Sequence, residues 1–201
     1  MPRVEQSVKA QFAKVFVQND WRLFKRMAEF HLKRAVFLRT SDMRRVAEPW
    51  RLLARNIDKR LLIGIGTELL LKAVYLRHDF SINRPVRGAA GAPAFPFTFQ
   101  QVQDVAQDPD ETYMFNDLIQ KLSSVSTVGS LGANEKGLKI AKVFRNKEGH
   151  VVVAKHTFDL TNYRDIEAAL VALYFRAFNQ TLRVRFSFKA GEKGVWRVRR
   201  R

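Results

Sequence analysis

One apolar stretch decides the fold: Leu61-Leu62-Ile63-Gly64-Ile65-Gly66-Thr67-Glu68-Leu69-Leu70-Leu71-Lys72-Ala73-Val74-Tyr75-Leu76. It is so apolar that most of it must be buried. Pro49 is acceptable in the first turn of a helix, so we expect a helix from about Pro49 to about Arg77. Gly64 and Gly66 predict one irregularity within that helix.

Glu68 and Lys72 are the only charged residues in this stretch. Their spacing of four places them on one face of a helix, where such residues often form a surface ion pair. Because the residues around them must be buried, the two charges either share a narrow exposed edge or line a polar cleft. The sequence leaves both interpretations open.

Apolar residues at helical spacing predict further helices before and after this one. The predicted ranges are about 4–17, 21–40, 112–125, 134–145 and 162–181. Asn19 and Asp20 suit the N-cap of the second of these helices. The last helix is apolar on nearly all sides, so we expect it to be the central one. The expected fold class is all-α, with residues 1–182 forming a single helical-bundle domain.

A long loop at about residues 79–100 interrupts the bundle and is rich in Pro, Gly and Ala. It exceeds an ordinary connection and suggests a flap or a tether. Phe95, Phe97 and Phe99 alternate within it. They either stack on nucleic-acid bases or cover the core, and the second is favoured because exposed apolar clusters are disfavoured.

Residues 183–201 depart from the helical pattern. Polar and apolar residues alternate on both sides of a glycine-flanked turn, which predicts a basic β-hairpin or extended tail. Its Arg residues stand beside Phe186, Phe188 and Trp196. Either the hairpin clamps nucleic acid, or its aromatic residues dock on the bundle while the Arg side chains are merely solvated.

The net charge of +17 comes from 36 Lys and Arg against 19 Asp and Glu, and it is concentrated at the two ends. Residues 1–87 carry 19 basic against 8 acidic residues, residues 88–182 carry 9 against 10, and residues 183–201 carry 8 against 1. An acidic polymer is the natural partner. Nucleic acid is favoured over a membrane, because no continuous basic amphipathic segment stands out.

Several classes of chemistry are excluded by the residues present. Cysteine is absent, which excludes disulfides, thiolate zinc sites and Cys nucleophiles. The sequence shows no phosphate-binding Gly-rich loop, no helical His pair with a Glu and no dense acidic cluster. We therefore expect chemistry with no metal and no cofactor. The sequence also shows no signal pattern and no membrane span, so we expect a cytoplasmic protein.

One short polar segment carries the residue types that phosphodiester cleavage needs: Arg145-Asn146-Lys147-Glu148-Gly149-His150. Arg can hold a phosphate through two parallel hydrogen bonds, and His can take and give a proton near pH 7. Asn146 and Gly149 predict that a helix ends here, so that both side chains can face one cleft. The alternative is a surface Arg and an unrelated loop His.

A second Arg and His at similar spacing, Arg26 and His31, provide an internal comparison. They lie within continuous helical periodicity, where residues five apart point in different directions. His31 falls on the buried face, and we interpret it as structural. His156, six positions beyond His150, is a candidate for a supporting role, with an exposed loop residue as the alternative.

The Arg-Asn-x-x-x-His motif, preceded by a helix, resembles the signature of the HEPN superfamily, small helical-bundle proteins of which many are metal-independent ribonucleases. The run from Gly66 to Ala73 is similar to a Glu-Leu-x-Leu-Lys-Ala run that these proteins often carry on an earlier core helix, with the acidic residue facing the site. The resemblance covers roughly residues 50–180. Members associated with nucleotidyltransferase antitoxins carry a Tyr where this chain has Val152, which argues against that subtype.

The resemblance implies an endoribonuclease that leaves a 2′,3′-cyclic phosphate and acts in phage defence or in a toxin–antitoxin system. It further implies a homodimer with a composite site and an antitoxin or other regulatory protein as a partner. On this hypothesis His150 activates the ribose 2′-hydroxyl or protonates the leaving oxygen, and Arg145 stabilises the phosphorane. The competing hypotheses are a non-catalytic RNA- or partner-binding helical module and a DNA-binding helical protein.

The candidate residues fall into two sets. The predicted catalytic residues are Arg145, His150, Asn146 and Glu68. The predicted RNA-binding residues are Arg51, Arg55 and Lys59, which form a basic ridge at intervals of four, together with Lys147, Arg183, Arg185, Arg197 and Arg199. Solvation alone would explain the ridge equally well.

Overall fold

The structure is a computed structural model that describes residues 20–38, 49–148, 160–186 and 193–200. Within these ranges, the side chains of residues 49–56, 109–110 and 147–148 are not described. The predicted helix at 4–17 lies outside the described residues, as do His150, His156 and Phe188.

The described part of the chain is mostly helical, with two small antiparallel sheets. Its helices are α2 (Trp21–Phe37), α3 (Pro49–Arg77), α4 (Phe115–Gln120), α5 (Glu135–Glu148) and α6 (Leu160–Phe178), with short 3-10 turns at Gln100–Val102, Leu122–Ser124 and Gly132–Asn134. Its strands are β1 (Asn83–Pro85), β2 (Gln107–Thr112), β3 (Gln180–Arg185) and β4 (Val195–Arg200). The predicted helical fold and C-terminal hairpin are confirmed, whereas β1 and β2 were not predicted and the chain is not purely α-helical.

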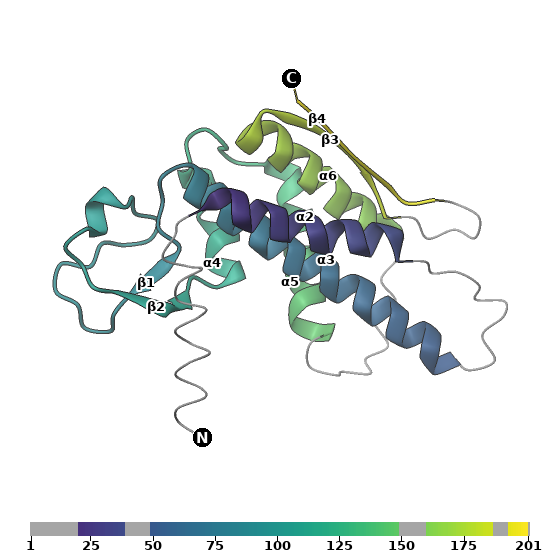
Figure 1. The fold of residues 1–201 in the computed structure, drawn as a ribbon, viewed down its shortest axis with the longest axis horizontal. Coiled ribbons are helices and arrows are strands. Elements are labelled where there is room, and N and C mark those ends of the chain that lie inside the picture. Colours follow the sequence, from purple (N-terminus) through teal and green to yellow (C-terminus); the bar gives the residue numbers. More distant parts are fainter. Residues whose placement is uncertain (1–19, 39–48, 149–159, 187–192, 201) are drawn as a thin grey trace.

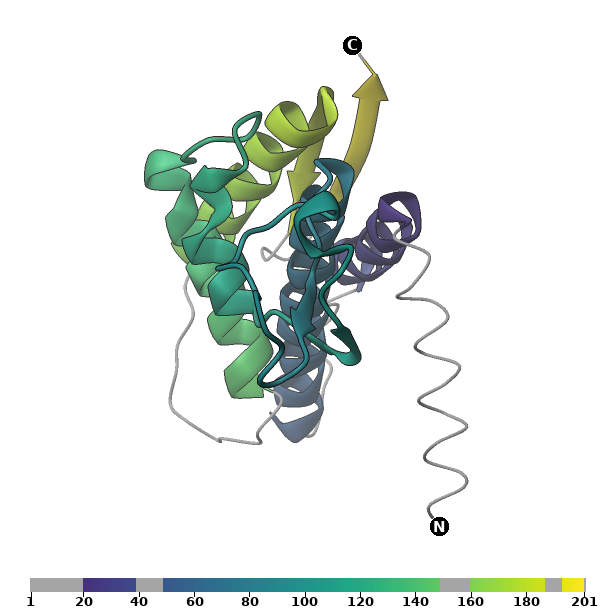
Figure 2. The same cartoon turned by 90° about the vertical axis from the view of Figure 1, so that its left-hand side faces the viewer.

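The long helix α3 lies between α2 and α5 (Figure 2). From Ile63 to Leu76 every residue except Ile65 and Leu69 is buried. The prediction that the last helix is the central one is wrong, because α6 leaves Val171 and Phe175 exposed along one side. Apolar residues therefore lie on nearly all sides of α6, but one of those sides faces solvent.

The helix α3 is continuous through Gly64 and Gly66, so the predicted irregularity is wrong. The two glycines instead allow close packing. A Cβ built at Gly64 would lie 2.6 Å from the Arg145 Cβ, and one built at Gly66 would lie 2.7 Å from the Leu32 Cγ. Carbon atoms cannot pack this closely, so the absent side chains let α5 and α2 approach α3.

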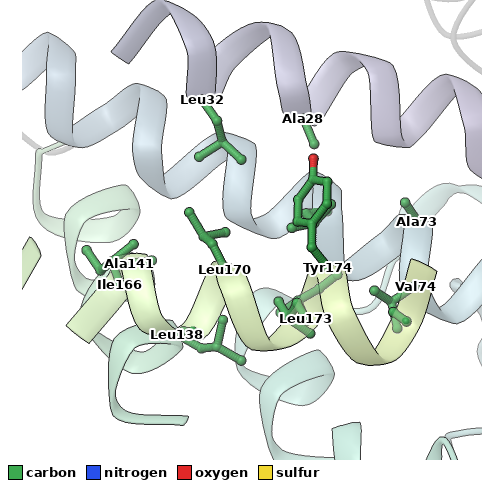
Figure 3. Packing of buried hydrophobic residues seen from close by; sticks show 14 of the residues in the cluster. Ala28, Leu32, Ala73, Val74, Leu138, Ala141, Ile166, Leu170, Leu173 and Tyr174 are labelled. Carbon is green, nitrogen blue, oxygen red and sulfur yellow. The ribbon is translucent and has the colours of Figure 1, made fainter. Parts of the chain in front are cut away.

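The core is built from residues of α2, α3, α5 and α6 that interdigitate (Figure 3). Tyr174 of α6 reaches toward α2, where its hydroxyl donates a hydrogen bond to Glu29 at 3.0 Å. The start of α2 is capped by the Asp20 carboxylate, which accepts from the Arg22 backbone N–H at 2.9 Å, as the sequence predicted.

The segment between α3 and α4 lies at one end of the bundle, where β1 pairs with β2 (Figure 1). Phe97 is completely buried, and Phe95 stacks on Tyr113 with the ring centroids 3.9 Å apart. Phe99 is partly buried against the core. The three rings therefore cover the core, which confirms the favoured alternative over base stacking.

Candidate functional site

Glu68 forms ion pairs with two cations, Lys72 on the same helix and Arg145 on α5, and the second pair joins α3 to α5. Its Oε2 lies 2.7 Å from Arg145 Nε, and its Oε1 lies 3.2 Å from Lys72 Nζ. Lys72 Nζ also donates to the Thr112 hydroxyl at 3.0 Å. The side chains of Glu68 and Lys72 are each only 10% exposed, so this is a buried polar cluster and not an exposed edge.

The geometry of this cluster follows from the sequence of α3. Gly64, Glu68 and Lys72 recur at intervals of four and therefore share one face of the helix. The absence of a side chain at Gly64 lets the backbone of Arg145 lie directly against α3. The Arg145 side chain then reaches the carboxylate one turn further along α3.

Arg145 is the exposed member of the cluster, with 47% of its side chain accessible against 10% for Glu68. Glu68 holds the Nε atom, and Arg145 Nη1 lies 3.4 Å from Asn146 Oδ1. The two terminal nitrogens form an edge that can grip a phosphate with two parallel hydrogen bonds. A buried carboxylate therefore holds the guanidinium on its Nε side, and the rest of the group is open to solvent.

The helix α5 continues past Arg145 to Glu148, about three residues beyond the predicted end, and its last residue lies within the segment 145–150 in which a helix end was predicted. Asn146 is an exposed helical residue, because the modest preference of Asn against helix is outweighed by the surrounding helical hydrogen bonds. Gly149 and His150 lie outside the described residues. The placement of His150 beside Arg145 therefore stays a prediction.

Lys59 is buried, with 1% of its surface exposed, so its predicted place on an exposed RNA-binding ridge is wrong. Burial lowers the pKa of Lys59 to about 8, while the charge of Glu167 on α6 acts in the opposite direction. Burial also raises the pKa of Glu167, whose carboxylate accepts a hydrogen bond from the Phe186 backbone N–H. Arg51 and Arg55 lie on α3 and Lys147 on α5, and their side chains lie outside the described part of the structure.

The hairpin of β3 and β4 packs along α6 (Figure 1). Arginines on both strands are exposed. We use the name arginine face for four exposed arginines that alternate along the two strands, Arg183, Arg185, Arg197 and Arg199. Arg200, the last residue of β4, is exposed as well but belongs to the other side of the strand. Arg183 lies directly opposite Arg197 in the register of the two strands. Like charges facing each other across strands repel, and a bound polyanion would relieve that repulsion.

The inner side of the hairpin is docked on the bundle. Phe186 is 1% exposed, and Trp196 packs edge-on against Tyr174 with the ring centroids 6.0 Å apart. The docking interpretation of these aromatic residues is therefore right, and stacking of bases on Phe186 is wrong. Among the described residues of the hairpin, the arginines now support the clamp hypothesis, and Phe188 lies outside the described residues.

Arg26 and His31, the second Arg and His at similar spacing, lie on α2 and do not form a site together. Arg26 is exposed, whereas His31 is partly buried and its pKa is lowered by burial and by Arg34. The buried face of the helix runs through Phe24 and Ala28. His31 lies at the edge of this face, which agrees with a structural role.

Sequence reasoning missed Gly64 and Thr112 as members of the cluster. Thr112 gave no signal, because it meets Lys72 only through the folding of a segment 40 residues away in sequence. Gly64 did give one, since it precedes Glu68 by one helical turn in a segment that had to be buried.

Comparisons of this chain with family models, with curated proteins and with solved structures found no match. In the described ranges, no helix is both long enough and apolar enough to cross a membrane. The same residues hold no group of three or more His, Asp or Glu side chains that could bind a metal ion.

Proposed function

We propose that the protein is a HEPN-type, metal-independent endoribonuclease that cleaves RNA by attack of the 2′-hydroxyl and leaves a 2′,3′-cyclic phosphate. The observation that carries the proposal is the 2.7 Å ion pair between Arg145 Nε and Glu68 Oε2. It joins the two sequence elements on which the family resemblance rests. A role in phage defence or in a toxin–antitoxin system, with an antitoxin as partner, belongs to the same proposal.

The proposed roles follow from exposure and chemistry. Arg145 binds the scissile phosphate through its terminal nitrogens and stabilises the charge that develops on the phosphorane. Glu68 positions Arg145, and Lys72 with Thr112 holds Glu68 in place. His150 acts as the general base or acid.

The direct test is cleavage of mixed cellular RNA by the purified protein in the presence of EDTA. We expect cleavage to persist and to yield 2′,3′-cyclic ends, and we expect His150→Ala and Arg145→Ala to abolish it. Lys139→Ala is the matched control, because Lys139 is an exposed cation on the same helix as Arg145. Loss of all activity in EDTA, or full activity of His150→Ala, would overturn the proposal.

We further propose a homodimer in which both chains contribute Arg145 and His150 to one cleft, since a single chain offers few catalytic groups. Mixing Arg145→Ala chains with His150→Ala chains should then restore part of the activity. A monomer at micromolar concentration with full activity would contradict the composite site.

The arginine face specifically favours a second candidate, a non-catalytic RNA-binding module. This alternative predicts salt-sensitive RNA binding without cleavage. It also predicts that His150→Ala changes neither binding nor the integrity of the RNA.

A further inference from the structure

A pocket with a volume of about 260 Å³ opens where the start of α2 meets the end of α3 and the base of the hairpin. Five cationic side chains line it, Arg22, Lys25 and Arg26 of α2, Arg77 of α3 and Arg200 of β4. Among the described residues, Glu29 is the only carboxylate in its lining. Five positive charges against one negative charge leave a net charge of +4 around the pocket.

The single carboxylate is already engaged. Glu29 lies 2.6 Å from Lys25 Nζ and 3.8 Å from Lys33 Nζ, and it accepts a hydrogen bond from the Tyr174 hydroxyl. Within the described residues, none of the four lining arginines has an Asp or Glu at ion-pair distance. Their charges are therefore available to a ligand.

Aromatic rings hold two of these arginines in place. The Arg77 guanidinium lies 4.6 Å from the Trp21 ring centroid and 5.6 Å from that of Phe178, and the Arg22 guanidinium lies 5.2 Å from Trp21. A cation–π contact orients a cation without neutralising it. The pocket thus presents fixed positive charge, which is the requirement for binding an anion without a large ordering cost.

One lining residue indicates that the ligand is more than a bare anion. Gln180 Oε1 is buried and has no hydrogen-bond partner among the described residues. A buried acceptor of this kind needs a donor, and a ligand hydroxyl or amino group supplies it when the Gln180 amide turns toward the pocket. A phosphate attached to a sugar or a base offers both the anion and the donor.

The pocket is separate from the Arg145 cluster. Arg77 follows Glu68 on α3 by nine residues (77 − 68), which corresponds to about 14 Å along the helix axis. Nine residues at about 100° each also amount to two and a half turns, so the two side chains leave α3 on opposite sides. A ligand in the pocket would not contact Arg145.

We propose that this pocket binds the phosphate group of a nucleotide, either a free mononucleotide or the terminal phosphate of an RNA strand. Its volume is below the roughly 300–1,000 Å³ of sites that enclose drug-sized ligands, so it suits a phosphate with its sugar. The proposal does not depend on the proposed ribonuclease activity, because it uses none of the same residues.

The test compares two double variants that remove equal charge, each with one change on α2 and one in the C-terminal hairpin region. Arg26→Gln with Arg200→Gln alters the pocket, whereas Arg34→Gln with Lys193→Gln alters an exposed cation of α2 and one just before β4, both outside the pocket and outside the arginine face. Calorimetric titration at constant ionic strength would use AMP, inorganic phosphate and adenosine as probes. We expect AMP to bind more tightly than phosphate and adenosine not to bind. The pocket pair should weaken AMP binding at least about tenfold, the control pair less than about twofold.

A second experiment tests whether the bound phosphate belongs to a free nucleotide or to the end of an RNA strand. It uses 2′-O-methyl oligonucleotides, which cannot form a cyclic phosphate and so are not cleaved. A preference for a 5′-phosphorylated over a 5′-hydroxyl strand that disappears in the pocket pair assigns the site to an RNA end. If the pocket pair loses AMP binding but keeps the preference for the 5′-phosphorylated strand, the pocket binds a free nucleotide. Equal weakening by the two pairs, binding of adenosine as tight as that of AMP, or no AMP binding at millimolar concentration would overturn the proposal.

Discussion

Glu68 is a buried carboxylate with two cationic partners, and the partners depend on it to different degrees. Lys72 is 10% exposed and loses its charged partner when Glu68 is neutralised, whereas Arg145 is 47% exposed and can turn to water. We therefore predict that Glu68→Gln lowers the free energy of unfolding by about 3 kcal/mol. Denaturant unfolding measures this change, with Glu111→Gln on the exposed surface as the matched control.

A second variant separates the structural role of Glu68 from its proposed role in catalysis. Replacing both buried charges, as in Glu68→Leu with Lys72→Leu, removes the stranded cation and should restore most of the lost stability. RNA cleavage should nevertheless stay low, because Arg145 has lost the group that orients it. Normal cleavage by this stable double variant would show that Glu68 does not position Arg145.

Because of Lys59, we predict that the free energy of unfolding changes with pH in the alkaline range. Its pKa in the folded protein is about 8 against an ordinary value of 10.5, so the unfolded chain holds the proton more tightly. Raising the pH through this window therefore favours folding, by about 2 kcal/mol between pH 8 and pH 10. The window ends near pH 10, where Tyr75 and Tyr174, whose pKa values are raised by burial, begin to act in the opposite sense.

The measurement is denaturant unfolding at pH 8 and pH 10 for the wild type, Lys59→Met and Lys139→Met. Lys59→Met should lose the gain in stability, and Lys139→Met, which alters an exposed cation, should keep it. An identical pH dependence of all three proteins would contradict the prediction.

The burial of Lys59 also shows a limit of sequence reasoning at the scale of one residue. Its spacing from Arg51 and Arg55 placed it correctly on one face of the helix. That spacing could not tell whether the face meets solvent or another element, and here it meets α6 through Glu167. By contrast, Glu68 was recognised because its apolar neighbours left only two places for its charge, a narrow exposed edge or a polar cleft.

At the scale of elements, the contact between α3 and α5 depends on Gly64. Alanine normally stabilises a helix by about 1 kcal/mol relative to glycine. Here a Cβ would lie 2.6 Å from both Cβ and N of Arg145, and the backbone of α5 cannot yield without moving the helix. We predict that Gly64→Ala destabilises the protein by about 1–3 kcal/mol and lowers RNA cleavage further than its stability loss explains.

Gly66→Ala is the matched comparison, since a Cβ there meets the Leu32 side chain of α2 and leaves the Arg145 contact intact. Both variants should lose stability in thermal unfolding, but below the unfolding range only Gly64→Ala should lose cleavage. Equal RNA cleavage by the two variants would show that cleavage does not depend on the close contact between α3 and α5.

Elements with strong local signals were predicted well, and those set by tertiary pairing were not. The helix α3 spans Pro49–Arg77 as expected, and the alternating pattern of the tail gave the hairpin. The strand β2, Gln107–Thr112, contains Asp and Pro and has little intrinsic preference for extended structure. It forms because β1 lies beside it, which no local pattern reveals.

At the scale of the whole molecule, the hairpin is both part of the core and the most basic surface patch that the sequence predicted. Val184 and Phe186 are buried, so deleting residues 183–201 would remove core contacts along with charge. A deletion therefore cannot distinguish weaker RNA binding from partial unfolding. Substitutions on the arginine face can, because its four side chains are exposed.

We predict that replacing all four residues of the arginine face by Gln weakens RNA binding and flattens its dependence on salt. Each lost contact with a phosphate of single-stranded RNA reduces the slope of log K against log salt by about 0.7, so four contacts account for about 3. Titration of a non-cleavable RNA analogue at several salt concentrations measures the slope. The matched control replaces four exposed cations outside the hairpin, Arg34, Arg87, Lys121 and Lys139, by Gln. If the control set flattens the slope as much as the arginine face does, the attraction comes from the net charge of +17 and not from the hairpin.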